Sequence, residues 1–247
     1  MYKYEMHCHT AETSRCSRLS GADLVDFYHS IGYTGIVITD HLYNYYLKDP
    51  TQPSWPERVE FFVAGYRAAK QRGEALGMDV FFAWEYSHKR KGNDFLTYGL
   101  DMDWLLENPD LDELHINDYY DLVHRDGGYV VHAHPFREAR YIDMIRLAPR
   151  KVDAVETINA CRTPFENCMA NLYAENYALP KICGSDNHRG PIPQLTSLDL
   201  PFRAGSVEEI VQAALRGEST LHLYQYDTER GLCEIPEDKV FCAAEKL

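Results

Sequence analysis

Short apolar runs alternate with segments of helical period along most of the chain. The run 35–39 is apolar throughout, which is typical of a strand buried on both faces. Before it, Leu24, Phe27 and Ile31 would share one face of a helix over 20–31. The same pattern predicts further strands at 2–8, 79–84, 95–100, 128–132, 152–156, 181–184 and 219–223, and further helices at 56–76, 116–125, 166–177 and 207–216. This alternation predicts an α/β fold with a parallel sheet.

The number of strand–helix units favours a closed sheet over an open one. About seven such units follow one another, and a ring of parallel strands with outer helices is the usual way to close them. No internal repeat or Gly/Ser-rich linker divides the 247 residues. We therefore expect a distorted (β/α)7 TIM-like barrel that forms a single domain over 1–247.

Composition limits the cellular compartment and the class of binding partner that we expect. The formal net charge of −13 disfavours a nucleic-acid backbone as partner. No apolar stretch approaches the ~18 residues that span a bilayer, and no apolar leader follows the charged N-terminus. The seven cysteines include no CxxC pair, which indicates reduced thiols. We expect a soluble cytoplasmic protein that has no membrane partner.

Histidines and acids follow the C-terminal ends of five predicted strands. His7 and His9 end the first strand, where side chains two residues apart share a face. The other groups are Asp40 with His41, Glu85, His132 with His134, and Asp186 with His188. A barrel assembles its active site at this end of its strands. Mixed imidazole and carboxylate ligands suit zinc, manganese or iron(II), and these groups suffice for two to three ions.

The motifs that contain these residues resemble those of the PHP family, named for its polymerase and histidinol-phosphatase members. They are His7–Thr10, Ile38–His41, Trp84-Glu85, Ala133–Arg137 and Gly184–His188, in the order of the family. The resemblance extends over nearly the whole chain. It implies a distorted (β/α)7 barrel that typically holds three metal ions.

The resemblance also implies a ligand set. The first ion would be bound by His7, His9, Glu85 and Asp186, the second by the bridging Glu85 with His134, and the third by His41 and His188. Asp94 stands where many members have a histidine, and we expect it to serve as a ligand there. In the loop after Thr10 the usual third-site ligand is replaced. We predict that Glu12 completes this site in preference to Cys16, with water as the alternative.

The predicted reaction is hydrolysis of a small phosphate monoester by hydroxide that the metal ions generate. The resemblance implies substrates such as histidinol phosphate or small nucleotides. Glu85 and Asp186 would be catalytic through the ions they hold. Arg137 would bind phosphate oxygens bidentately, with a surface salt bridge as the alternative, and Arg189 is a second candidate.

Two other functions remain open from the sequence. One is an exonuclease or phosphodiesterase, and the other is a metal-binding regulatory module without catalysis. Substrate choice is expected to depend on the loops 42–55 and 137–142. In the first of these loops, packing is the favoured role for Tyr43, Tyr45 and Tyr46.

Overall fold

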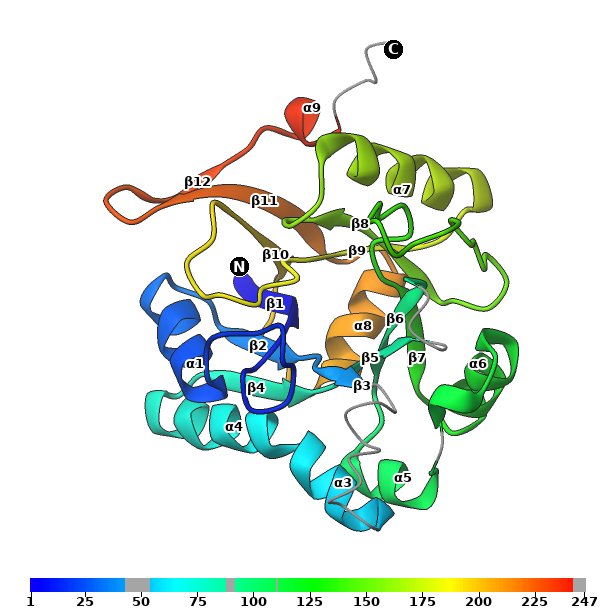
Figure 1. Ribbon diagram of the computed structural model, residues 1–247. Helices are drawn as coiled ribbons and strands as arrows, with labels where there is room; N and C mark the ends of the chain where they lie inside the picture. Colours follow the sequence, from blue (N-terminus) through cyan, green and yellow to red (C-terminus); the bar gives the residue numbers. More distant parts are fainter. Residues whose placement is uncertain (43–53, 88–91, 110, 242–247) are drawn as a thin grey trace.

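A computed structural model describes residues 1–42, 54–87, 92–109 and 111–241 (Figure 1). Within them the strands form two six-stranded sheets. The first has the order β12 (Gly231–Glu234), β11 (Thr220–Asp227), β10 (Gln194–Leu200), β1 (Tyr2–Cys8), β2 (Gly35–Ile38) and β4 (Asp79–Phe82). The second has the order β3 (His41–Leu42), β5 (Trp84–Ser87), β6 (Asp94–Tyr98), β7 (Tyr129–His132), β8 (Ala154–Asn159) and β9 (Lys181–Gly184).

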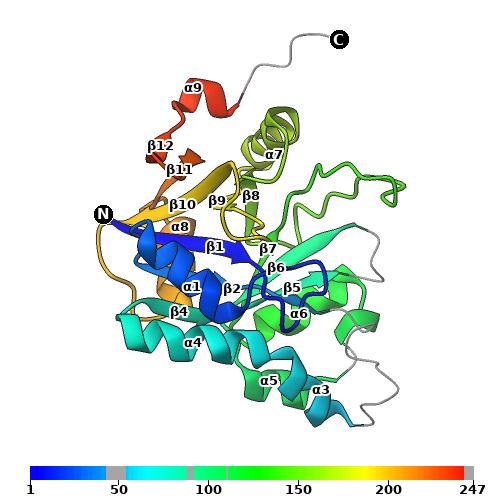
Figure 2. The same cartoon turned by 60° about the vertical axis from the view of Figure 1, so that its left-hand side comes forward.

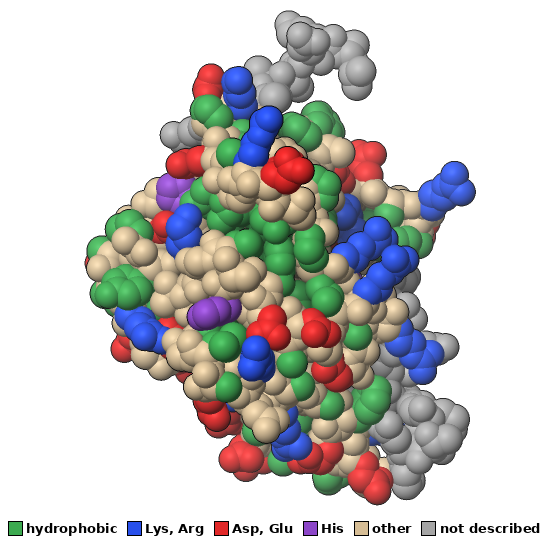
Figure 3. Space-filling view, turned by 90° about the vertical axis from the view of Figure 1, so that its left-hand side faces the viewer, with side chains coloured by type: hydrophobic (Ala, Val, Ile, Leu, Met, Phe, Trp, Pro, Cys, Tyr) green, Lys and Arg blue, Asp and Glu red, His purple; other side chains and the backbone are tan. Residues whose placement is uncertain are grey.

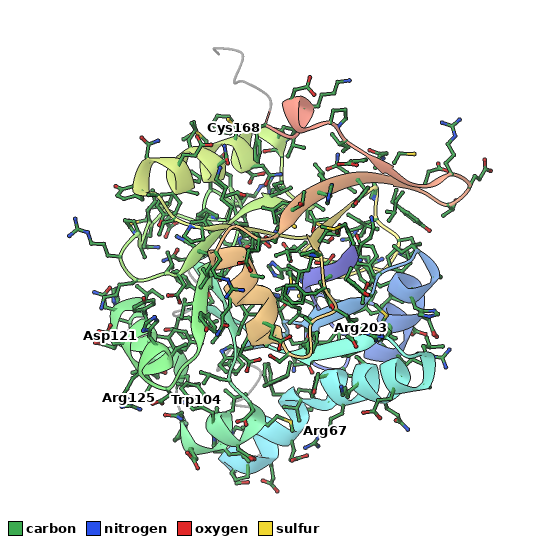
Figure 4. The ribbon with its side chains drawn as sticks, turned by 180° about the vertical axis from the view of Figure 1, so that it is seen from behind. Arg67, Trp104, Asp121, Arg125, Cys168 and Arg203 are labelled. Atoms are coloured by element: carbon green, nitrogen blue, oxygen red, sulfur yellow. The ribbon has the colours of Figure 1, made fainter. Side chains whose placement is uncertain are left out.

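Helices pack against the outer faces of these sheets, including the face seen from behind in Figure 4. They are α1 (Gly21–Ser30), α3 (Trp55–Phe62), α4 (Ala64–Leu76), α5 (Met102–Glu107), α6 (Ile116–Arg125), α7 (Pro164–Tyr177), α8 (Val207–Leu215) and α9 (Glu237–Val240), with a short 3-10 helix at Leu111–Glu113. α1 and α4 pack together on one side, and α7 covers β8 on another (Figure 1). The helix predicted over 56–76 is divided at Val63, between α3 and α4.

The view from behind shows α8 across the middle of the molecule (Figure 4). Its buried Ile210 and Val211 belong to one apolar cluster with Met6 of β1 and Ile182 of β9, so this helix contributes to a core that strands of both sheets share. Just before the helix, Arg203 forks onto the Asp79 carboxylate of β4 at 2.8 and 2.9 Å. The arginine side chain is half exposed, so we expect this ion pair to contribute little stability.

The α/β class is confirmed, but the sheets are mixed rather than parallel. β1–β2–β4 and β7–β8–β9 are parallel, whereas β5–β6–β7 and β1–β10–β11 are antiparallel. Only six residues separate β5 from β6. A crossover helix that would keep two strands parallel needs about a dozen residues or more. The prediction of a parallel sheet throughout is therefore wrong.

No closed barrel is formed by the strands that the structure describes. β1 uses residues 2–4 to pair with β10, and its backbone pairing with the chain after β9 is limited to an isolated bridge between Cys8 and Asn187. Between the segment that joins β2 to β3 and the segment that joins β4 to β5, the N–H groups of Ala83 and Glu85 donate to the carbonyl oxygens of Ile38 and Asp40. These bonds join the two sheets where β2 and β4 lead into β3 and β5. The ring of ladders that the TIM-like prediction requires is thus interrupted.

β1 lies at the centre of this arrangement. Its residues from Tyr4 to Cys8 are all buried, so its carboxyl end carries side chains into the interior. Figure 2 shows β1 pointing toward the side on which the β1–α1 loop and the long segment between β7 and β8 lie. This side of the sheets holds the histidine and carboxylate groups described next.

Two properties of the described residues bear on the expected setting. None of their helices has the length and apolar character required to cross a membrane. Their cysteines carry free thiols, at Cys8, Cys16, Cys161, Cys168, Cys183 and Cys233.

Candidate metal centre

The ligand-type side chains predicted from the strand ends do come together, although the barrel is not closed. β1 supplies His7, and His9 directly follows it. The other contributions are His41 of β3, Glu85 of β5, Asp94 of β6, His134 after β7, and Asp186 with His188 after β9. All are buried except His188, whose side chain is 20% exposed. All of them except Asp186 form three overlapping groups of potential metal ligands, and Asp186 lies beside the first group.

The first group surrounds His7 and His9. Their Nε2 atoms lie 3.1 Å apart, and both face Oδ1 of Asp186 at 3.6 and 3.4 Å. Glu85 oxygens lie 3.8 and 3.6 Å from the same two nitrogens. Ligand atoms at ~2.0–2.2 Å from a tetrahedral zinc ion are themselves roughly 3.3–3.6 Å apart. The spacing of these four side chains therefore fits one shared ion.

The second group consists of Glu85, Asp94 and His134. Nε2 of His134 lies 3.2 Å from Oε1 of Glu85. Oδ1 of Asp94 is buried, and among the described residues it has no hydrogen-bond partner. A buried carboxylate oxygen without a partner is costly, and a cation at this position would remove the cost. Since Glu85 belongs to both groups, its carboxylate is placed to bridge two ions.

The third group consists of His9, His41 and His188, on the open side of the centre. Nε2 of His41 lies 3.4 Å from Nε2 of His188. The opposite ring nitrogens are held from behind, because His41 Nδ1 lies 2.5 Å from Glu85 Oε2 and His188 Nδ1 lies 2.9 Å from the Asp186 carbonyl oxygen. For His188, whose partner is a backbone carbonyl, such an outer contact fixes the ring orientation and directs Nε2 toward His41.

Glu12 is not placed at this third group. Its carboxylate accepts the N–H of Gly21 at 3.0 and 3.1 Å and thereby caps the start of α1. The cause is the loop pairing, in which Ala11 donates its N–H to Leu19 and turns Glu12 toward the helix. Cys16 lies beside the histidines instead. Burial would raise the pKa of its thiol, but hydrogen bonds to His188 and His41 lower it to about 6.

Glu156 is a member of the site that the sequence analysis missed. Its Oε1 lies 2.8 Å from His7 Nδ1, while its Oε2 accepts the N–H of His134 and the amide of Asn159 at 2.8 and 2.9 Å. It ends the predicted strand 152–156, so the signal that identified the other groups was present here too. A Cβ on Gly184 would lie 2.4 Å from both Glu156 Oε1 and His7 Cβ. Only glycine allows this approach.

Two of the carboxylates at the centre, those of Glu85 and Asp186, have lowered pKa values, whereas burial and the nearby Glu85 raise the pKa of Asp94. Burial opposes the charge of Glu85, but His41, His134 and His7 lower its pKa well below the usual range. Burial likewise opposes the charge of Asp186, and the surrounding imidazoles again lower the pKa well below the usual range. Ionised carboxylates are the form that binds metal ions.

Two of the candidate ligands have an uncommon backbone conformation. His134 has a φ of 27° and Asp186 a φ of 53°, in the left-handed region that residues other than glycine seldom adopt. Backbone strain of this kind occurs mainly at functional sites, where the surrounding structure enforces it. For Asp186, bonds from His9 N–H to the Asn187 carbonyl oxygen and from Asn187 N–H to the His7 carbonyl oxygen hold the turn against β1.

A pocket of about 660 Å³ opens beside the centre. Asp186 and His188 line it together with Arg137, Arg162 and Arg189. Burial opposes the charge of Arg137, but the nearby Asp186 and other acidic groups raise its pKa. Its Nε is buried and has no hydrogen-bond partner in the described part of the chain. Arg137 thus lies in the same pocket as Asp186, and its role at the phosphate stays a prediction.

Most of the first proposed substrate loop, 42–55, lies outside the described residues. This includes Tyr43, Tyr45 and Tyr46. The second, 137–142, is described and is irregular. Part of it lines a further pocket with Asp143 and Ile145, next to Arg137.

No family model matches the sequence, and no curated protein matches it. Solved structures share its fold. A two-domain protein from Bacteroides vulgatus, described as containing a predicted PHP-like metal-dependent phosphoesterase, has a TM-score of 0.66 and 16% identity over 91% of this chain. The chain covers 64% of that protein, less than two thirds of its length.

Two further structures match at similar identity. A proposed metal-dependent phosphoesterase from Bifidobacterium adolescentis has a TM-score of 0.53 and 14% identity, covering 86% of this chain and 95% of its own. An amidohydrolase from Chromobacterium violaceum, with bound sulfate and no metal, has a TM-score of 0.51 and 13% identity, covering 85% and 96%. The resemblance to the PHP family that the motifs indicate is thus matched by the fold, which is shared with a structure described as containing a PHP-like metal-dependent phosphoesterase.

Proposed function

We propose that the protein is a metal-dependent phosphoesterase that hydrolyses a small phosphate monoester. The observation that carries the proposal is the convergence of three overlapping ligand groups, two of which share the carboxylate of Glu85. Next to them, Arg137 lines a pocket that could receive the phosphate. Zinc, manganese and iron(II) all suit this donor set, and we propose two to three ions.

The residues of the chain would hold and orient the reactants. When bound, divalent ions at such a centre lower the pKa of water and offset phosphoryl charge. Glu85 would fix the separation of two ions, while Glu156 would keep His7 in its orientation. Arg137 would fork onto two phosphate oxygens from the pocket side and so align the phosphoryl group.

The size of the pocket and the net charge of the whole chain favour a small substrate over a polymer. A volume of about 660 Å³ lies within the range of small-molecule pockets. The chain has a formal net charge of −13, and Figure 3 shows acidic and basic side chains interspersed on one face. A nucleic-acid backbone would need enough local positive charge to overcome this excess.

The test is a hydrolysis screen of metal-free protein reconstituted with zinc, manganese or iron(II). The panel should contain phosphate monoesters, phosphodiesters, oligonucleotides and amides. We expect monoesters to be hydrolysed fastest and the activity to disappear with a chelator. Faster turnover of oligonucleotides would establish the exonuclease alternative, and faster turnover of amides an amidohydrolase. Bound ions without hydrolysis of any compound would favour a regulatory module.

Replacing Arg137 tests the phosphate contact separately from the metals. Arg137→Ala should keep its metal content and raise the KM for a phosphate monoester. The loss of a charge-assisted contact costs about 1.5–3 kcal/mol, roughly a tenfold effect or more. Arg189→Ala, which removes an exposed arginine from the same pocket, is the matched control and should have a smaller effect. Unchanged kinetics in Arg137→Ala would remove this residue from the site.

A further inference from the structure

The loop between β1 and α1 is fastened to the backbone of two histidines of the third group. Arg18 donates its N–H to the His188 carbonyl oxygen at 2.8 Å. The hydroxyl of Ser17 lies 2.8 Å from the His9 carbonyl oxygen and 3.1 Å from that of His188. Both residues follow Cys16 directly, so these bonds fix the cysteine over the open side of the centre.

The thiol of Cys16 lies close enough to both His41 and His188 to interact with them electrostatically. It also lines the 660 Å³ pocket with His188. The three histidines of this group present nitrogen atoms within 4.8 Å of one another, which is compact enough for one ion. Neutral imidazoles leave the full charge of a divalent ion uncompensated, and the carboxylate of Glu12 is bound to Gly21 instead.

We propose that the Cys16 thiolate is a ligand of the third metal site, together with His41 and His188. On binding, the thiol would release its proton to solvent and the sulfur would donate an electron pair to the ion. Thiolate is a soft ligand that favours zinc over magnesium or manganese. The third site would thus prefer a more thiophilic ion than the first two, whose ligands are nitrogen and oxygen. This inference rests on the metal centre proposed above.

Cobalt(II) provides the test, because a thiolate bound to cobalt gives a charge-transfer absorption in the near ultraviolet that nitrogen and oxygen ligands do not give. Metal-free protein titrated with cobalt(II) should develop this band, and Cys16→Ser should lose it. Two variants are matched controls that should retain the band. Cys161→Ser removes another exposed thiol that lines the same pocket, and Glu12→Gln changes the rival ligand.

A second readout uses zinc and does not require a variant. Alkylation of Cys16, followed by peptide mass spectrometry, should be slower in the zinc-loaded protein than in the metal-free protein. Cys233, an exposed cysteine of β12, should react equally in both states.

The outcomes separate this inference from the proposal it rests on. Cobalt binding without the charge-transfer band, or a band that persists in Cys16→Ser, would refute Cys16 as a ligand and leave the metal centre intact. Failure of the wild-type protein to bind cobalt(II) or zinc at all would refute the centre itself.

Discussion

Glu85→Gln is expected to abolish most of the activity and to weaken two metal sites at once. The carboxylate of Glu85 lies 3.2 Å from His134 Nε2 in one ligand group and within 3.8 Å of His7 and His9 in another. A neutral amide would remove the negative charge from both groups. The loss of one preorganised charged group at a reaction centre lowers kcat by roughly 10²–10³-fold. Turnover under saturating metal, together with metal titration, measures both effects.

The control for this variant is Glu60→Gln, which removes an exposed carboxylate paired with Arg67 on the surface. It should leave metal binding and turnover unchanged. If Glu85→Gln kept the metal content and near-normal turnover, Glu85 would not be the bridging ligand.

Glu156→Ala should have the second-largest effect, through a residue that we expect to touch no ion. The substitution leaves His7 Nδ1 and the N–H of His134 without their carboxylate partner. Loss of an outer contact to a metal-binding histidine typically lowers metal affinity or activity by about 10–100-fold. Competition with a chromophoric chelator would measure the affinity of the centre.

The conservative variant distinguishes positioning from a purely structural role. Glu156→Gln keeps an acceptor for His7 and should recover part of the affinity lost in Glu156→Ala. Equal metal affinity in the wild type and Glu156→Ala would show that His7 is oriented without this contact.

The candidate ligands at strand ends could be predicted because their position at the end of a strand depends on local sequence. β1 spans Tyr2–Cys8 as predicted, and its apolar run carries His7 and His9 to the carboxyl end of a buried strand. The orientation of loop residues is not determined by a local residue pattern. Glu12 and Cys16 both lie on one connection, and the bond between Ala11 and Leu19 decides which faces the histidines. That bond joins residues eight positions apart, and no residue pattern in the loop predicts it.

The topology was harder to predict than the secondary structure. Alternation of strands and helices does not reveal that β5 and β6 form a hairpin. β10 (Gln194–Leu200) was not predicted. It pairs with the edge of β1 that the last strand of a closed barrel would pair with. Strand order depends on tertiary pairing, for which single-sequence periodicity gives no signal.

Metal content tests the proposed centre most directly. We expect elemental analysis of gently purified protein, or of protein reconstituted with zinc, manganese or iron(II), to find about two to three equivalents per chain, because the ligand groups exceed what one four-coordinate ion can use. Less than one equivalent after purification, with none regained on reconstitution, would contradict a metal cluster at Glu85.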